Sequence, residues 1–197
     1  TVAVTDDATE PGPDSSTLFA PGDLPDLTVT SDPTDYELGV RFTVGADGMA
    51  TGLRYYRGTA DADDLDVRIL NLWSSDGALL ASVTVVSDQG VTGWQGGTFE
   101  TPVRLDAGTS YVASYGTTQN YAYSSSFFAD DWVSDDGYLT APADGGGISN
   151  GVFFAGGTNQ FPTQSYNASN YWVDPIIEPL DLFPLAGALP PVEEMLL

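Results

Sequence analysis

The stretch Glu37-Leu38-Gly39-Val40-Arg41-Phe42-Thr43-Val44 alternates between apolar and polar or small residues. Its apolar members, at every second position from 38 to 44, would share one face, which is the period-two pattern of a half-buried β-strand. Ala46-Asp47-Gly48 then supplies turn residues, and residues 51–56 read as the next strand. We therefore expect an antiparallel hairpin here.

The same pattern continues along the chain and predicts an all-β fold. The turn signals Ser75-Asp76-Gly77 and Asp88-Gln89-Gly90 separate further apolar runs. Further strands are expected at residues 65–73, 78–86, 94–99, 103–105, 110–115, 121–128, 151–155 and 171–177. We expect an antiparallel β-sandwich of about eight to ten strands, jelly-roll-like, with a long irregular loop over residues 129–150.

Two Pro-rich segments flank the expected sandwich. Residues 1–35 are acidic and show no persistent period, which predicts an extended N-terminal arm before a domain at residues 36–175. Residues 176–197 form a Pro-rich C-terminal arm that is too apolar to extend into water. This arm either covers its own sandwich or lies on a neighbouring subunit, and we favour the neighbour. Its apolar side chains are Ile176, Ile177, Leu180, Leu182, Phe183, Leu185 and Leu189.

The composition excludes most familiar chemistries. The 197 residues include 28 acidic and 5 basic residues, all Arg, for a net charge of −23. Such a polyanion is a poor partner for nucleic acid or an anionic membrane. The chain has no His and no Cys, which removes Ser-His-Asp and Cys-His catalysis, thiol redox chemistry and the usual zinc and haem ligands. We expect no enzymatic activity, although a pair of carboxylates alone could run glycoside hydrolysis.

Several ordered motifs resemble a known family. They are Glu37-Leu38-Gly39-Val40-Arg41-Phe42, Gly52-Leu53-Arg54-Tyr55-Tyr56, Leu72-Trp73 with Asp76-Gly77-Ala78-Leu79-Leu80-Ala81, Gly93-Trp94-Gln95, Thr101-Pro102-Val103, Ala107-Gly108 with Tyr111-Val112-Ala113-Ser114-Tyr115, and Phe161-Pro162 with Asn170-Tyr171-Trp172-Val173-Asp174. Over residues 18–175 the chain resembles a secreted bacterial β-sandwich family catalogued as a domain of unknown function. That family often accompanies immunoglobulin-like and fibronectin-like modules in extracellular, glycan-associated proteins. The resemblance implies an extracellular, non-enzymatic domain and brings no catalytic or binding residues with it.

Aromatic side chains are the first candidates for a binding surface. Aromatic rings make up 12% of the chain, and such rings can stack on sugars. The structural alternative is that they fill the sandwich core. Trp132 is surrounded by Asp residues in an expected loop, so Trp132 with Phe128 is the predicted glycan platform.

Clustered carboxylates are the candidates for a metal site. Four carboxylates lie within six residues at the start of an expected strand, and they could supply part of the oxygen shell that calcium needs. They are Asp61, Asp63, Asp64 and Asp66. The cluster lacks the Gly and distal Glu of an EF-hand loop, and a solvated acidic loop is the alternative. A second cluster lies at residues 130–136, and Glu37 or Asp174 could also hold an ion. The solvated loop is favoured, so the sequence requires no cofactor, and structural calcium is the candidate if one is bound.

The surroundings of the protein are expected to be extracellular or at the cell surface. The chain begins with Thr1, as a processed protein would, and its Lys-free acidic composition suits a saline or calcium-rich exterior. The equally weighted alternative is a GC-rich genome, whose codons favour Arg, Asp, Gly and Ala. Asn167-Ala168-Ser169 is an acceptor sequence for N-glycosylation. We expect a structural subunit that assembles with copies of itself through its terminal arms. A glycan-binding accessory module that takes polysaccharide is the alternative, and neither reading involves nucleic acid or membrane insertion.

Overall fold

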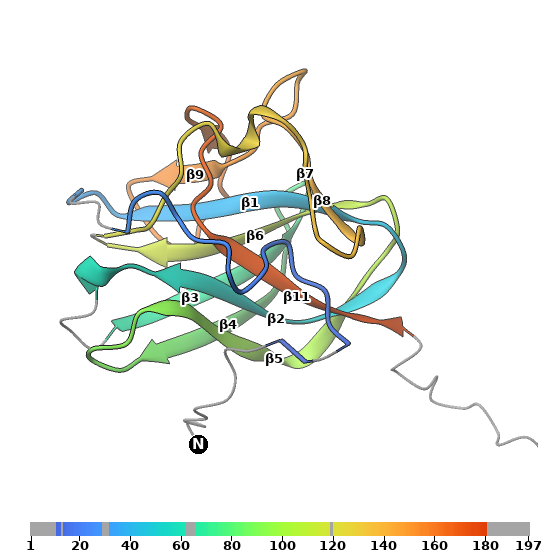
Figure 1. Ribbon diagram of the computed structural model, residues 1–197, viewed down its shortest axis with the longest axis horizontal. Coiled ribbons are helices and arrows are strands. Elements are labelled where there is room, and N and C mark those ends of the chain that lie inside the picture. The colour runs from blue at the N-terminus through green and yellow to red at the C-terminus, as the bar shows by residue number, and fades with distance from the viewer. Residues whose placement is uncertain (1–10, 13, 29–31, 62–65, 119, 181–197) are drawn as a thin grey trace, which may run out of the picture.

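The computed structural model describes residues 11–12, 14–28, 32–61, 66–118 and 120–180. These residues form strands and two single 3₁₀ turns (Figure 1). The strands are β1 (Tyr36–Val44), β2 (Gly48–Arg57), β3 (Asp66–Ser74), β4 (Leu79–Ser87), β5 (Gly93–Leu105), β6 (Ser110–Thr117), β7 (Trp132–Val133), β8 (Leu139–Ala141), β9 (Val152–Ala155), β10 (Gln164–Ser165) and β11 (Val173–Pro179). The turns are η1 (Thr59–Asp61) and η2 (Phe127–Ala129).

The strands make two antiparallel sheets, which confirms the all-β sandwich. The larger sheet has the order β10-β9-β1-β6-β3-β4, and β8 extends it beside β1 with β7 at its outer side. β1 pairs along its length with β6, while its other edge is shared between β9 near Tyr36 and β8 near Val44. The smaller sheet has the order β11-β2-β5.

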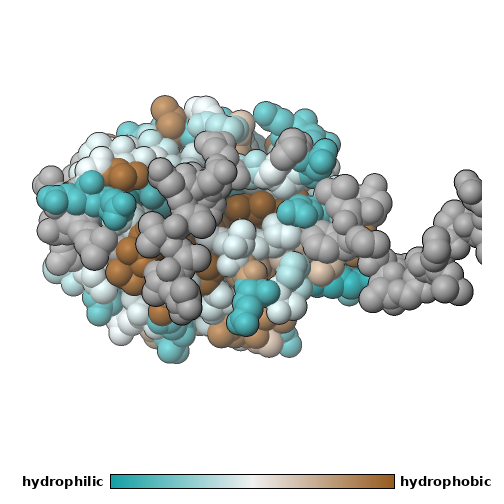
Figure 2. Space-filling view, turned by 90° about the horizontal axis from the view of Figure 1, so that it is seen from below, coloured by the Kyte–Doolittle hydropathy of each residue, from teal (hydrophilic) through white to brown (hydrophobic). Residues whose placement is uncertain are grey.

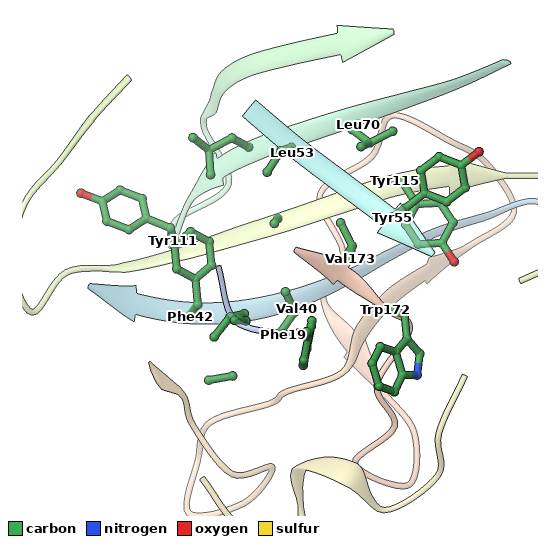
Figure 3. Packing of buried hydrophobic residues seen from close by; sticks show 14 of the residues in the cluster. Phe19, Val40, Phe42, Leu53, Tyr55, Leu70, Tyr111, Tyr115, Trp172 and Val173 are labelled. Carbon is green, nitrogen blue, oxygen red and sulfur yellow. The ribbon is translucent and has the colours of Figure 1, made fainter. Parts of the chain in front are cut away.

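The core lies between these sheets and follows the alternation seen in the sequence. Leu38, Val40, Phe42 and Val44 of β1 are all buried, as their period-two spacing predicted. Across the interface, Tyr55 of β2 stacks on Tyr115 of β6, with ring centroids 5.2 Å apart. Figure 3 shows these rings among the aliphatic side chains that fill the space between the sheets.

Some expected elements differ from the structure. Residues 94–105 form one strand with an irregular register against β2, rather than two strands. Residues 121–128 were expected to be a strand, but they are irregular. In the described part of the chain, the β-bridges of this segment are the isolated ones at Tyr123 and Ser124. Ser126 has a left-handed φ of 59° that turns the chain into η2. The expected loop at 129–150 contains the short strands β7 and β8.

Both predicted arms contribute to the sandwich where the structure describes them. In the N-terminal segment, Leu18 and Phe19 are fully buried, and Ser16 pairs with Ile177 of β11. Figure 1 shows this dark-blue segment lying against the red strand β11. Ile176 and Ile177, expected to dock on a neighbour, are buried in β11 of their own small sheet. The predicted boundary at residue 176 is therefore wrong, because β11 continues to Pro179.

In the described part of the chain, no helix has the length and apolarity needed to cross a membrane.

Candidate functional site

The outer face of the small sheet carries a cage of aromatic rings around Phe19. The stacked ring of Trp94 lies 6.0 Å from that of Phe19, and Trp172 lies 5.1 Å from it. Phe127 of η2 and Trp132 of β7 complete the enclosure at 5.8 and 6.1 Å. We call these four rings the aromatic cage. It is built from four separate stretches of the chain and holds one side chain of the N-terminal segment.

An ion pair beneath the cage binds the backbone of the same segment. Nη2 of Arg54 lies 2.7 Å from Oδ2 of Asp174, and both side chains are at most 1% exposed. Asp174 also accepts hydrogen bonds from the amides of Leu18 and Phe19, while Arg54 donates to the carbonyl oxygen of Phe19. The guanidinium carbon lies 4.3 Å from the centre of the Trp94 ring.

Together, the aromatic cage and the pair of Arg54 and Asp174 form a site that we call the N-terminal groove. Its polar contacts go to two amides and a carbonyl in the main chain of residues 18–19, and its rings surround the side chain of Phe19. Burial raises the pKa of Asp174 to about 6, against the opposing effect of Arg54 and the two amides. At neutral pH the pair is therefore ionic.

A second buried carboxylate, Glu37 of β1, lies on the outer face of the large sheet. It accepts hydrogen bonds from Nδ2 of Asn71 at 2.9 Å, from the hydroxyl of Ser114 at 2.5 Å and from the amide of Asn159 at 2.7 Å. Burial raises the pKa of Glu37, because only neutral groups compensate its charge.

The Asn159 contact ties the loop before β10 to the sheet. Gly116 makes this approach possible, since a Cβ there would lie 2.8 Å from the Cβ of Thr158. Glu37 thus acts as an anchor for the loop.

A cluster of rings gathers at the end of the sandwich where β1 begins, on the left in Figure 1. Its members are Tyr36, Tyr121, Tyr123, Tyr171 and Phe153, and we call it the tyrosine cluster. Tyr121 lies at its centre, with the rings of Tyr36, Tyr123 and Tyr171 at 5.8, 6.1 and 6.0 Å. The hydroxyl of Tyr36 donates to Asp32 at 3.0 Å. Desolvation raises the pKa of Tyr121 to about 12, so its phenol stays protonated. Apart from Tyr171, the members are partly exposed.

A comparison with protein families agrees with the resemblance noted in the sequence. A family model described as "Domain of unknown function (DUF4082)" matches residues 22–173, which is most of the chain. The chain belongs to this family. The comparison with curated proteins gave no match. Membership of DUF4082 assigns no role to the aromatic cage, the tyrosine cluster or Glu37.

The predicted glycan platform lies in the wall of the aromatic cage. Phe128 is fully buried, so the prediction that it stacks on a sugar is wrong for this residue. Trp132 is partly buried, and its indole nitrogen donates to the carbonyl oxygen of Leu18 at 2.9 Å. Its ring faces Phe127 and Phe19 instead of a free surface. The acidic residues around Trp132 in the sequence had suggested an exposed loop.

Some of the residues predicted to bind a metal lie outside the described part of the chain. Asp63 and Asp64 lie outside the described residues, as do the side chains of Asp61 and Asp66, so calcium binding there stays a prediction. Among the described residues, no three acidic side chains come together as a metal site, including those at 130–136. Asp131 and Asp136 accept hydrogen bonds within their own loops. Asp174 has Arg54 as its counter-charge and needs no ion.

The remaining predicted residues divide between the surface and the undescribed part of the chain. Asn167 is exposed and has a positive φ of 51°, and its glycosylation stays a prediction. Leu180 ends the described chain, while Leu182, Phe183, Leu185 and Leu189 lie outside it. Leu18, Phe19 and Arg54 were not among the residues predicted from the sequence. An apolar pair within an acidic, Pro-rich segment was the available signal for the first two.

Proposed function

We propose that the protein is a non-catalytic structural subunit of an extracellular or cell-surface assembly, joined to copies of itself through its terminal segments. The observation that carries the proposal is the groove of the small sheet. There the aromatic cage holds Phe19, and the pair of Arg54 and Asp174 holds the backbone of residues 18–19. A groove of this kind suits an extended segment added to the edge of a sheet.

The same contacts are open to the N-terminal segment of another copy. Exchange of an identical segment between protomers preserves every contact, so it is a low-cost route to assembly. Residues 20–24 connect the segment to Pro25, which is buried, and they contain Leu24, which is 61% exposed. Such a connector has little core to lose when the segment moves to a neighbour.

Two features support a non-catalytic role. Without His and Cys, acid-base chemistry would fall to carboxylates, and the groups best suited to it have perturbed pKa values. Within the described residues, the carboxylates with raised pKa are Glu37 and Asp174, and both are fully buried and hydrogen-bonded. Neither presents an oxygen to a substrate.

The test is competition with a free segment. Sedimentation velocity of the full chain in concentrated salt should reveal oligomers that grow with protein concentration. A peptide of residues 14–23 should shorten them by filling the groove, while the same peptide with Phe19→Ala should not. Oligomers indifferent to both peptides would contradict the terminal route, and a chain that stays monomeric would contradict assembly altogether.

The tyrosine cluster favours carbohydrate binding as a second candidate function. Partly exposed Tyr rings offer apolar faces for a sugar, and Tyr36 with Asp32 offers a polar edge for its hydroxyls. The net charge of −23 favours a neutral polysaccharide over an anionic one. Affinity electrophoresis through neutral glucan and chitin-derived gels should show retardation that Tyr123→Ala removes. Leu24→Ala, an exposed apolar control elsewhere, should keep it. No retardation of the wild type in either gel rules out this candidate for those sugars.

A further inference from the structure

Strand β4 ends the large sheet, and its inward side chains Val83 and Val85 pack against β5 at Gly97. Within the described residues it pairs with β3 on one side. Its sequence, Leu-Leu-Ala-Ser-Val-Thr-Val-Val-Ser, contains no charged residue and no Pro. Natural proteins normally protect a long edge strand with charges, Pro, bulges or a covering segment. Here the register irregularity opposite Leu72 and Trp73 disturbs only the Leu79–Leu80 end, and residues 81–87 pair regularly.

The hairpin of β3 and β4 also carries a concentration of exposed apolar side chains. Five of the eleven large exposed hydrophobic residues of the described chain belong to it. They are Val67 at 57%, Ile69 at 37%, Leu79 at 53%, Leu80 at 38% and Val86 at 46% exposure. Val67 is paired directly with Val86, and Ile69 with Thr84, so they share one face of the sheet. The underside of the molecule, where β4 and β5 lie in Figure 1, shows apolar residues in Figure 2.

This nine-residue strand without charge lies at a sheet edge of a chain with a net charge of −23. Two such chains repel each other over most of their surfaces, and the least repulsive approach brings uncharged surfaces together. A polar rim around an apolar centre is typical of protein interfaces. Asp88 follows β4 directly and would form part of such a rim.

We propose that β4 pairs antiparallel with β4 of a second copy, about a two-fold axis at Thr84. This inference rests on the proposed role as an assembling subunit, and it adds a second joint that is separate from the N-terminal groove. Pairing centred on Thr84 joins all of the regular stretch from Ala81 to Ser87. It also places Asp88 of each copy opposite Leu80 of the other, so the two Asp88 carboxylates stay apart.

A second copy is the fitting occupant because an edge strand needs another edge strand. In the described chain, β10 is only two residues long, and β11 is flanked by Ser16. The outer strand β5 contains Glu100 and Arg104. β4 is thus the edge that two acidic copies can share without bringing charges together, and salt should strengthen the pairing by screening the remaining repulsion.

The test compares one charge at two paired positions. Val86→Glu places a carboxylate on the edge strand, while Val67→Glu places it on the same face one strand further in. Both variants add the same charge, so general repulsion rises equally. In sedimentation equilibrium at high salt, Val86→Glu should raise the dissociation constant at least about tenfold, and Val67→Glu by clearly less.

Crosslinking keeps the inference testable if Val86→Glu folds poorly. The chain has no Cys, so Thr84→Cys and Ile69→Cys each provide one thiol. Oxidation should join Thr84→Cys into dimers and leave Ile69→Cys largely monomeric. If both crosslink equally, or if the two Glu variants weaken association equally, the β4 joint is wrong while assembly through the N-terminal groove stands. A wild type that is monomeric at every salt concentration overturns both proposals.

Discussion

Asp174 and Glu37, two buried carboxylates of the described chain, both hold an irregular segment on a sheet, but their charges are compensated differently. Each is fully buried, and each fastens an irregular segment to a sheet. Asp174 holds the amides of residues 18–19 on the small sheet, and Glu37 holds the amide of Asn159 on the large one. Arg54 compensates the charge of Asp174, whereas the described partners of Glu37 are an amide side chain, a hydroxyl and a backbone amide.

This difference determines which substitution destabilises each site most. A buried ion pair fails when one partner is removed, because the other charge is left without compensation. A buried carboxylate held by neutral donors already loses free energy through desolvation of its charge. Removing the charge therefore destabilises the fold less than removing the oxygen atoms that accept the hydrogen bonds. Substitutions at Arg54 and at Glu37 separate these two cases.

Removal of Arg54 should have the largest effect. Arg54→Met leaves Asp174 buried and unpaired, which should lower the free energy of unfolding by about 3–5 kcal/mol. Urea unfolding followed by circular dichroism in constant high salt would measure the loss. Arg54→Met with Asp174→Asn should recover part of it, because no charge then remains. Arg104→Met is the matched control, since Arg104 forms exposed pairs with Asp47 and Asp106 and should change little. Equal losses in the two single variants would contradict the assigned role of the buried pair.

Substitution of Glu37 should have an intermediate and graded effect. Glu37→Ala leaves the buried donors of Asn71 and Ser114 without their acceptor and should cost about 1–3 kcal/mol. Glu37→Gln keeps one oxygen and removes the charge, so its loss should be smaller. The new side-chain NH2 group would face the backbone amide of Asn159, which then loses its acceptor. Hydrogen exchange of the Asn159 backbone amide should therefore accelerate in Glu37→Gln. The reverse order of stability, or unchanged exchange, would show that Glu37 does not anchor the loop.

The smallest effect concerns pH. A carboxyl with a raised pKa binds its proton more tightly in the folded state, so stability should rise as pH falls from 7 through about 6. Exposed Asp32 has the opposite shift, because the amide of Thr34 and two hydroxyls lower its pKa, and such groups remove stability below about pH 4. Unfolding measured at constant high ionic strength should therefore show a maximum between these limits. Glu37→Gln should flatten the rise from neutral pH, and an unchanged slope would contradict the shift assigned to Glu37.

The sandwich could be predicted from the sequence because the alternation of apolar and polar residues within each strand reports which side chains are buried. The alternation in β1 reports burial residue by residue, and Leu38 to Val44 lie where it placed them. The same signal misled at residues 121–128. There the aromatic spacing imitates a strand, but Tyr121 and Tyr123 belong to the tyrosine cluster and Ser126 turns the chain.

The aromatic cage could not be predicted because it joins distant segments. Arg54 and Asp174 are separated by 120 residues, and Phe19 comes from a segment without any period. Arg54 alternates with the inward residues Leu53 and Tyr55, so the sequence pattern places it on a polar, exposed face. Only the fold shows that the N-terminal segment and residues 127–132 cover that face.

The aromatic cage also makes the molecule a reporter of its own state. Three of the four Trp residues, at positions 94, 132 and 172, surround Phe19, while Trp73 lies in a separate cluster with Val112 and Val152. In a Trp73→Phe background, all indole fluorescence would therefore come from the cage. Departure of the N-terminal segment would then appear as a red shift in emission while the rest of the sandwich stays folded.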